Sequence, residues 1–220
     1  MADSGNLAGM TQGGMSRDRA RVVVVTGAPG SGKSTLGAEL SRALRMPFLA
    51  RDDVRGGLFF TAGAWSARPG RVPTAEESVE TFLRILETTA SLGVSCIVEY
   101  VVRQQRPADL QRLSSVADCV VVLTECRDHV ERFAGRNRTD RLLNRPPVLE
   151  ALGYTTVHEH TSDAVARMRA VANAMQVNFG LPTLRVNTDD GYEPGLDAIV
   201  DFVIAGTQWP PGRPRPAGCR

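Results

Sequence analysis

Residues 21–35 read RVVVVTGAPGSGKST, and this stretch decides the fold. Its first half is a continuous run of β-branched residues, which is typical of a strand covered on both faces in a parallel sheet. Its second half matches the pattern G-x-x-x-x-G-K-[ST] of a phosphate-binding loop, which opens a helix. The loop consists of Gly27, Ala28, Pro29, Gly30, Ser31, Gly32, Lys33, Ser34 and Thr35.

Each residue type in this loop has a chemical role. The glycines let the backbone wrap so that N–H groups and the helix N-terminus face a β-phosphate. Lys33 is expected to bridge the β and γ oxygens, and the Ser34 hydroxyl to ligate Mg²⁺. A glycine-rich turn with an incidental lysine is the plain alternative, but Lys33 is the only lysine in the chain. The loop therefore predicts binding of Mg-ATP.

The rest of the chain repeats a strand and helix order. This order predicts an α/β, three-layer P-loop NTPase fold, with a mainly parallel five-stranded sheet and helices on both faces. A capping box of Thr74 and Glu77 is expected to open the longest helix. The expected strands are 21–26, 47–50, 94–100, 118–124 and 183–187, and the expected helices are 34–44, 74–92, 107–116, 128–133, 163–175 and 195–204.

Length and composition indicate one domain. The 220 residues suffice for one well-buried core, which we place at residues 21–206. Residues 1–20 and 207–220 lack periodicity and are expected to be a disordered leader and tail. No apolar stretch approaches the roughly 18 residues of a membrane span. We therefore expect a cytoplasmic protein with no membrane partner, and no obligate protein partner is evident.

Two classes of nucleotide-binding protein do not fit the sequence. Guanine-specific switches read the base with N-K-x-D, which needs a second lysine. Motor-type ATPases need an Asp-Glu pair at a strand end, whereas the strand ending at Tyr100 offers Glu99 alone. Kinases remain, and they require an acceptor site and an arginine-bearing lid.

The second strand is followed by Arg51-Asp52-Asp53-Val54-Arg55. Ligands of open α/β sheets bind at the carboxyl ends of the strands, where this segment lies. One of its carboxylates could accept the proton of an acceptor hydroxyl. The plain alternative is that the acidic pair only caps a helix.

A run of arginines follows the fourth strand and ends before two prolines. Arginine suits bidentate contact with phosphate, and a loop bounded by proline can open and close. The run is therefore expected to be a lid, although a solvated basic surface is the plain alternative. Its members are Arg132, Arg136, Arg138, Arg141 and Arg145.

The motifs GAPGSGKST at 27–35 and RDDVR at 51–55 resemble the group of P-loop kinases that contains polynucleotide 5′-kinases, chloramphenicol phosphotransferases and zeta toxins, with an AAA-type ATP-binding domain. The resemblance implies that Asp52 is the general base and that Arg55 contacts an anion of the acceptor. Asp53 is placed with Arg55 among the substrate-binding residues.

The same resemblance implies that Arg136, with Arg141 or Arg138, contacts the ATP phosphates. Arg136 and Arg141 are assigned to catalysis and Arg138 to cofactor binding. Glu99 departs from the pattern, because relatives often end this strand with Asp. We group Glu99 with the substrate-binding residues; it either positions Mg²⁺ through water or is structural.

The expected activity is transfer of the γ-phosphoryl group of Mg-ATP to a hydroxyl acceptor, either a nucleic-acid 5′ end or a small metabolite or antibiotic. The segment 68–72 and the aromatic residues Phe59, Phe60 and Trp65 are expected to form the acceptor wall. Residues 187–190 either hold the adenine edge or form an ordinary turn. The alternative function is a non-catalytic or slowly hydrolysing ATP-binding module that signals nucleotide state to a partner.

Overall fold

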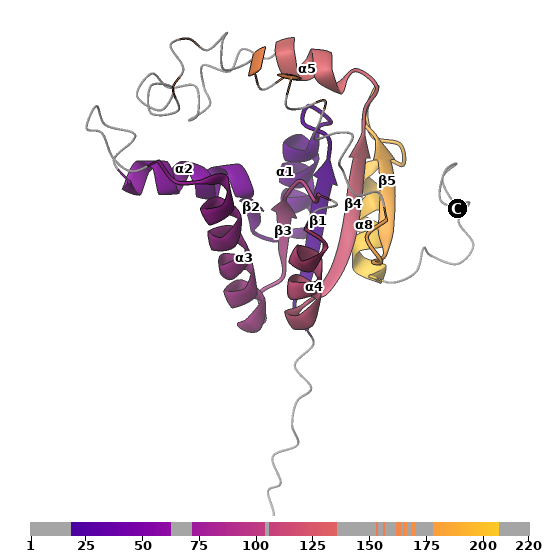
Figure 1. Cartoon of the computed structure of the whole chain (residues 1–220). Coiled ribbons are helices and arrows are strands. Elements are labelled where there is room, and N and C mark those ends of the chain that lie inside the picture. The colour runs from indigo at the N-terminus through magenta and orange to yellow at the C-terminus, as the bar shows by residue number, and fades with distance from the viewer. Residues whose placement is uncertain are drawn as a thin grey trace, which may run out of the picture.

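A computed structural model describes residues 19–62, 72–103, 106–135, 153, 156, 162–163, 165–166, 169 and 178–206. Five parallel strands form one sheet in the order β2-β3-β1-β4-β5 (Figure 1). The strands are β1 Arg21–Gly27, β2 Phe48–Ala50, β3 Cys96–Glu99, β4 Asp118–Glu125 and β5 Thr183–Asn187. The helices are α1 Lys33–Leu44, α2 Arg51–Thr61, α3 Ala75–Ser91, α4 Pro107–Val116, α5 His129–Gly135 and α8 Leu196–Ala205.

Hydrophobic clusters cover both faces of the sheet. Val22 and Val24 of β1 face one cluster, whereas Val23 and Val25 face the other, as the alternation of a strand requires. The first cluster takes its helical side chains from α3 and α4, and the second from α1 and α8. This arrangement confirms the predicted three-layer architecture. Ala20, which we assigned to the leader, is buried in the first cluster.

The parallel sheet brings the carboxyl ends of its strands to one edge. Glu99 at the end of β3 is in register with Val25 of β1 and with Ala50 at the end of β2. On the other side of β1, Gly27 is in register with Thr124 of β4. The phosphate loop and the segment that follows β2 therefore lie at the same edge, with β3 between their strands.

The predicted opening of α3 is confirmed in atomic detail. The Thr74 hydroxyl accepts from the Glu77 N–H at 3.1 Å, and the Glu77 carboxylate accepts from the Thr74 N–H at 2.8 Å. This reciprocal pair satisfies two backbone donors that the helix leaves without an internal partner. In the described ranges, no helix combines the length and the apolar character that a membrane crossing requires.

One helix was not predicted. Residues 51–61 form α2, which starts directly at the end of β2. A helix after this strand is raised above only as the alternative in which the acidic pair caps it, and Gly56 and Gly57 give the segment a weak helix propensity. Packing against α3 overrides this weak propensity: Phe59 of α2 is completely buried.

Candidate active site

The phosphate loop has the backbone conformation that its glycines allow. Gly30 and Gly32 have φ values of 86° and 83°, in the left-handed region that disfavours other residues. The Lys33 side chain is 6% exposed, and its ammonium group donates to the Ala28 carbonyl at 2.8 Å. Ser34, the next residue, is exposed at the start of α1. The lysine therefore lies across the loop, while the adjacent hydroxyl is accessible.

Two loop glycines also approach neighbouring elements too closely for a side chain. A Cβ atom on Gly27 would lie 2.3 Å from the Thr124 hydroxyl oxygen, and one on Gly30 would lie 2.0 Å from the His129 carbonyl oxygen. Because His129 begins α5, the tip of the phosphate loop packs directly against this helix. The glycines thus serve the packing of the loop as well as its conformation.

Buried hydroxyl groups support the loop from below. The Ser31 and Thr124 hydroxyl oxygens are 2.6 Å apart, and the Thr124 hydroxyl also donates to the Thr26 carbonyl at 3.1 Å. The Thr188 hydroxyl donates to the Ser31 carbonyl at 3.0 Å. The end of β4 and the residue after β5 therefore contact the phosphate loop through side-chain hydroxyls, and Thr124 also binds the backbone at the end of β1.

The turn after β5 is tied to the start of α5. Asp189 accepts from the backbone N–H and the guanidinium of Arg127, both at 2.9 Å. These bonds, the backbone one first, hold the pKa of Asp189 well below its usual range. Arg132 donates to the carbonyls of Thr188 and Asp189 at 2.8 and 2.5 Å. Arg132, which we counted among the lid arginines, thus binds this turn.

The acidic pair lies in the first turn of α2 rather than at its cap. The N-cap residue is Ala50, with no side-chain capping bond, so the plain capping alternative for Asp52 and Asp53 is not what the structure shows. Both side chains are exposed. The Asp52 carboxylate accepts from the Arg51 guanidinium at 2.8 Å. Carboxylates in this turn are stabilised by the helix dipole and remain accessible to a ligand.

Arg55 lies one turn further along α2 and stacks on an aromatic ring. Its guanidinium carbon is 5.4 Å from the centre of the Phe59 ring. Phe59, which we expect in the acceptor wall, is completely buried and lies beneath Arg55, so its ring is not open to an acceptor in this structure. Phe60 is 65% exposed. Trp65 and residues 68–71 of the predicted wall lie outside the described residues, and Val72 is half-buried.

The end of β3 leads into a buried polar network that sequence analysis missed. Glu99 is half-buried at the carboxyl edge. The next residue, Tyr100, donates its hydroxyl to Asp109 of α4 at 2.5 Å, and Arg106 donates to the same carboxylate oxygen at 2.9 Å. Burial, together with the bond to Asp109, raises the pKa of Tyr100. The network fixes the chain where it leaves β3.

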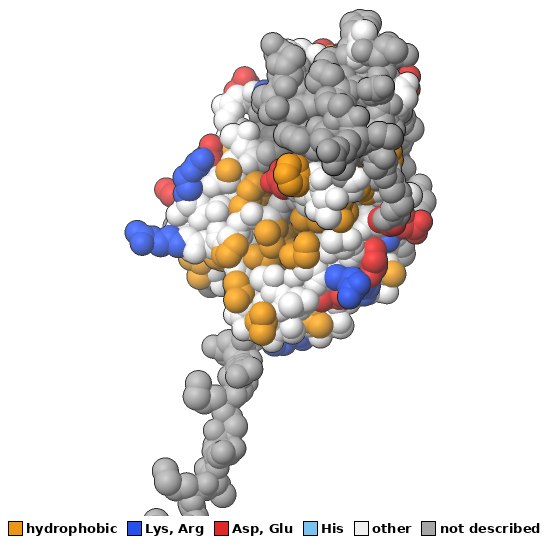
Figure 2. Space-filling model, turned by 90° about the vertical axis from the view of Figure 1, so that its left-hand side faces the viewer, with side chains coloured by type: hydrophobic (Ala, Val, Ile, Leu, Met, Phe, Trp, Pro, Cys, Tyr) orange, Lys and Arg blue, Asp and Glu red, His pale blue; other side chains and the backbone are white. Residues whose placement is uncertain are grey.

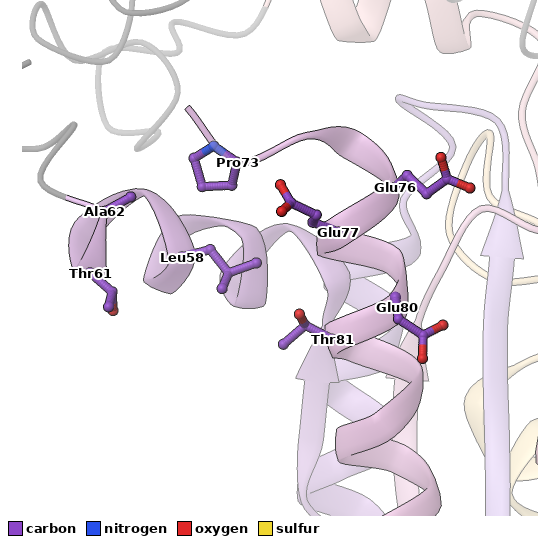
Figure 3. A pocket seen from close by; sticks show the side chains of 8 residues that line it. All are labelled: Leu58, Thr61, Ala62, Pro73, Glu76, Glu77, Glu80 and Thr81. Atoms are coloured by element: carbon purple, nitrogen blue, oxygen red, sulfur yellow. The ribbon is translucent and has the colours of Figure 1, made fainter. Parts of the chain in front are cut away.

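A pocket of about 580 Å³ lies in the angle between α2 and α3 (Figure 3). It starts at Leu58, six residues beyond Asp52, a helical rise of about 9 Å. The pocket is therefore separate from the acidic pair. Its lining residues are Leu58, Thr61, Ala62, Pro73, Glu76, Glu77, Glu80 and Thr81.

The surface around this pocket is partly apolar. Figure 2 shows apolar side chains on the side of the molecule that α2 and α3 form. The exposed large hydrophobic residues include Phe60 of α2 and Ile85 of α3. By contrast, Glu76 and Glu80 at the pocket pair with Arg106 and Arg112 respectively. Two of the three glutamates that line the pocket therefore have an arginine partner.

The arginines assigned to ATP, namely Arg136, Arg138 and Arg141, lie outside the described residues, and so does Arg145. Their roles remain predictions. Of the predicted run, the structure describes Arg132 alone, whose contacts are given above.

The strand order, the parallel sheet and the phosphate loop define the fold of the P-loop kinases. The sequence profile of one family, described as AAA domain, matches residues 22–152, which is more than half of the chain. The protein belongs to this AAA domain family. No curated protein matches it by sequence.

Solved structures share the fold. One is described as "a putative kinase" from Chloroflexus aurantiacus J-10-fl, with 24% identity and a TM-score of 0.62 over 87% of this chain and all of that one. Another is a sugar kinase from Janibacter sp. HTCC2649, with 16% identity and a TM-score of 0.52 over 86% of this chain and 99% of that one. At these identities the similarity establishes the fold alone.

Proposed function

We propose that the protein is an ATP-dependent kinase that transfers the γ-phosphoryl group of Mg-ATP to a hydroxyl acceptor. One observation carries the proposal. The glycine loop with Lys33 and the acidic turn with Asp52 lie at the same edge of the sheet, on strands separated by β3. Strands two positions apart are about 10 Å apart, which leaves room for a terminal phosphate and an acceptor between the two groups.

The nucleotide side of the site fits a triphosphate. The N-cap of α1 is Gly32, which offers no side chain to the first-turn N–H groups, so these donors are left for an anion. Lys33 would exchange the Ala28 carbonyl for the β and γ oxygens. The exposed Ser34 hydroxyl would hold Mg²⁺, which would neutralise charge on the phosphates during transfer. Arg136, Arg138 and Arg141 are proposed to contact the phosphates.

The acceptor side is proposed to be the first turn of α2. Asp52 would orient the acceptor hydroxyl and take its proton, as a general base within hydrogen-bond reach does. Asp53 and Arg55 would contact other groups of the acceptor, with Arg55 suited to an anion. Glu99, at the end of the strand between the two halves, is proposed to face the reaction centre as well.

The proposed mechanism is in-line transfer with no covalent intermediate on the protein. Positioning and charge stabilisation account for most of the catalysis in phosphoryl transfer. The residues proposed to position the donor lie in the loop between β1 and α1 and at the start of α1, whereas those proposed to position the acceptor lie in α2. A polynucleotide 5′-hydroxyl and a small metabolite or antibiotic are the proposed acceptor classes.

The test is transfer of labelled γ-phosphate from ATP to a panel of 5′-hydroxyl oligonucleotides, nucleosides, aminoglycosides and other hydroxylated metabolites. Lys33→Ala serves as the blank, because it removes the ammonium group and leaves the loop glycines intact. Labelled product that is absent from the blank is expected, and it would name the acceptor class. Label released only as free phosphate across the panel would contradict transfer and favour an ATP-binding module that signals nucleotide state to a partner.

A further inference from the structure

We propose that Thr188, the residue after β5, is a positioning residue that aims the Gly32 amide of the phosphate loop at the bound phosphate. The proposal rests on the function proposed above, since it concerns the same site. Thr188 is 6% exposed and lies far from the loop in sequence. Its hydroxyl nevertheless lies 3.0 Å from the Ser31 carbonyl oxygen and 3.2 Å from the Glu125 carbonyl oxygen, and these two acceptors share its one proton, with Ser31 the nearer. From the sequence, residues 187–190 either hold the adenine edge or form an ordinary turn, and neither alternative includes this contact.

The bond from Thr188 fixes the direction of a peptide group. The Ser31–Gly32 peptide is trans, because the only cis bond in the described residues is Glu193–Pro194. In a trans peptide the N–H points opposite to the C=O. With the Ser31 carbonyl held toward Thr188, the Gly32 N–H points away from it. Gly32 at φ 83° and ψ 7° tolerates this orientation, which other residues disfavour.

The other end of Ser31 is held as well. Thr124 has one hydroxyl proton, which it donates to the Thr26 carbonyl, an acceptor only. At the 2.6 Å contact between the two hydroxyls, Ser31 is the donor whenever the Thr124 proton is directed at the Thr26 carbonyl. The side chain of Ser31 is thus bound to β4, while its carbonyl is bound to the residue after β5. A peptide held from both sides does not need to reorient when phosphate arrives, which is the usual basis of preorganised binding.

Thr188 is itself held in place by neighbouring residues. Its N–H donates to the Glu125 carbonyl at 2.9 Å, and its own carbonyl accepts from Arg132 of α5 at 2.8 Å. A Cβ atom on Gly32 would lie 3.5 Å from the Thr188 hydroxyl oxygen, so the two residues are in ordinary contact. The backbone of Thr188 is therefore held by β4 and α5 rather than by the phosphate loop, and its hydroxyl also lies 3.2 Å from the Glu125 carbonyl oxygen at the end of β4.

The test uses two substitutions at Thr188 and a matched control on the same strand. Thr188→Val keeps the branched shape and removes the hydroxyl, whereas Thr188→Ser keeps the hydroxyl. The control is Thr183→Val at the opposite end of β5, where the hydroxyl donates to the Leu181 carbonyl at 2.8 Å, away from the loop. Calorimetry would measure the binding of tripolyphosphate and of ATP, each with Mg²⁺. Tripolyphosphate has no base, so it reports on the phosphate loop alone.

We expect Thr188→Val to weaken both ligands by about the same factor, three- to tenfold, as loss of one hydrogen bond predicts. Thr188→Ser and Thr183→Val should bind within about twofold of wild type. The proposal is wrong if Thr188→Val binds tripolyphosphate like wild type, including the case in which only ATP binding weakens. Should Thr188→Val not unfold cooperatively, Thr188→Ala replaces it under the same criteria. If the wild-type protein binds neither ligand better than Lys33→Ala does, the proposed function fails first.

Discussion

Replacing Gly30 by alanine tests the geometry of the phosphate loop most directly. Gly30 has a φ of 86°, and forcing an L-residue into this region costs about 1 to 2 kcal/mol. The added Cβ would also lie 2.0 Å from the backbone carbonyl oxygen of His129. Real Cβ contacts essentially never fall below 3.0 Å, so the loop tip or α5 must shift by about 1 Å. Because the colliding atom belongs to the backbone, a side-chain rotation cannot relieve the contact.

Both effects act on the part of the loop that is proposed to surround the phosphates. We therefore expect Gly30→Ala to weaken ATP binding by about 2 kcal/mol or more, which is a loss of roughly 30-fold or greater. The assay is calorimetric titration with Mg-ATP, accompanied by thermal unfolding to establish that the variant is folded.

Gly57→Ala is the matched control. Gly57 is exposed within α2, and a Cβ atom there meets nothing within 4 Å. Alanine is favoured over glycine in a helix by roughly 0.5 to 1 kcal/mol, so this variant should be slightly more stable and bind ATP normally. If folded Gly30→Ala binds ATP within about threefold of wild type, the loop tip at Gly30 does not surround the phosphates as proposed.

Two further predictions concern the acidic turn and the outer helices. Asp52→Asn keeps a side-chain oxygen that can accept a hydrogen bond from Arg51, so the affinity for ATP should persist. The rate of phosphoryl transfer should fall by about 10²- to 10⁴-fold, because the proton acceptor is lost. Unchanged turnover in the labelled-phosphate assay would reject Asp52 as the base. Arg112 pairs with Glu80 and Glu87 and lowers the pKa of both carboxyls, chiefly by hydrogen bonding. The stability that these pairs add is therefore present above about pH 4.5 and is lost as the pH falls toward the lowered pKa values of the two carboxyls. In urea unfolding from pH 3 to 7, the stability gap between wild type and Arg112→Gln should narrow as the pH falls below about 4.5, and a gap that stays constant from pH 7 to pH 3 would contradict this linkage.

The sheet was predictable because its strands have a strong and simple pattern. Val22 to Val25 form a continuous apolar run, and all four side chains are completely buried. A strand covered on both faces has no polar positions to blur this signal. The phosphate loop was equally clear, since few residue types satisfy its backbone and its chemistry together. The alternation of strands and helices predicted a mainly parallel sheet, whereas the order of its strands came from the structure.

The start of α2 shows where local patterns fail. Gly56 and Gly57 lower the helix propensity of this segment, and the helix is stabilised by the packing of Phe59 rather than by propensity. The same helix determines where Phe59 lies: its ring is buried beneath the Arg55 guanidinium and does not form part of the surface. Aromatic residues near a predicted site are equally consistent with both roles until the helix is known.

Contacts between residues distant in sequence could not be predicted at all. The hydrogen bond from Thr188 to Ser31 joins residues 157 positions apart, and the one between Ser31 and Thr124 joins residues 93 positions apart. No periodicity or motif encodes such a pair, since either threonine could serve any polar turn. The buried position of each threonine beside a strand end becomes meaningful only when the sheet brings the strand ends together.

The position of Lys33 also offers a chemical handle. It is the only lysine side chain in the sequence, and its amine lies across the phosphate loop against the Ala28 carbonyl. An acylating reagent would therefore find one side-chain amine in the whole molecule, at the place where nucleotide is proposed to bind. The extent of acylation at Lys33, read by peptide mass spectrometry so that the N-terminal amine is counted apart, would report how much of the loop is occupied, without any label or engineered residue.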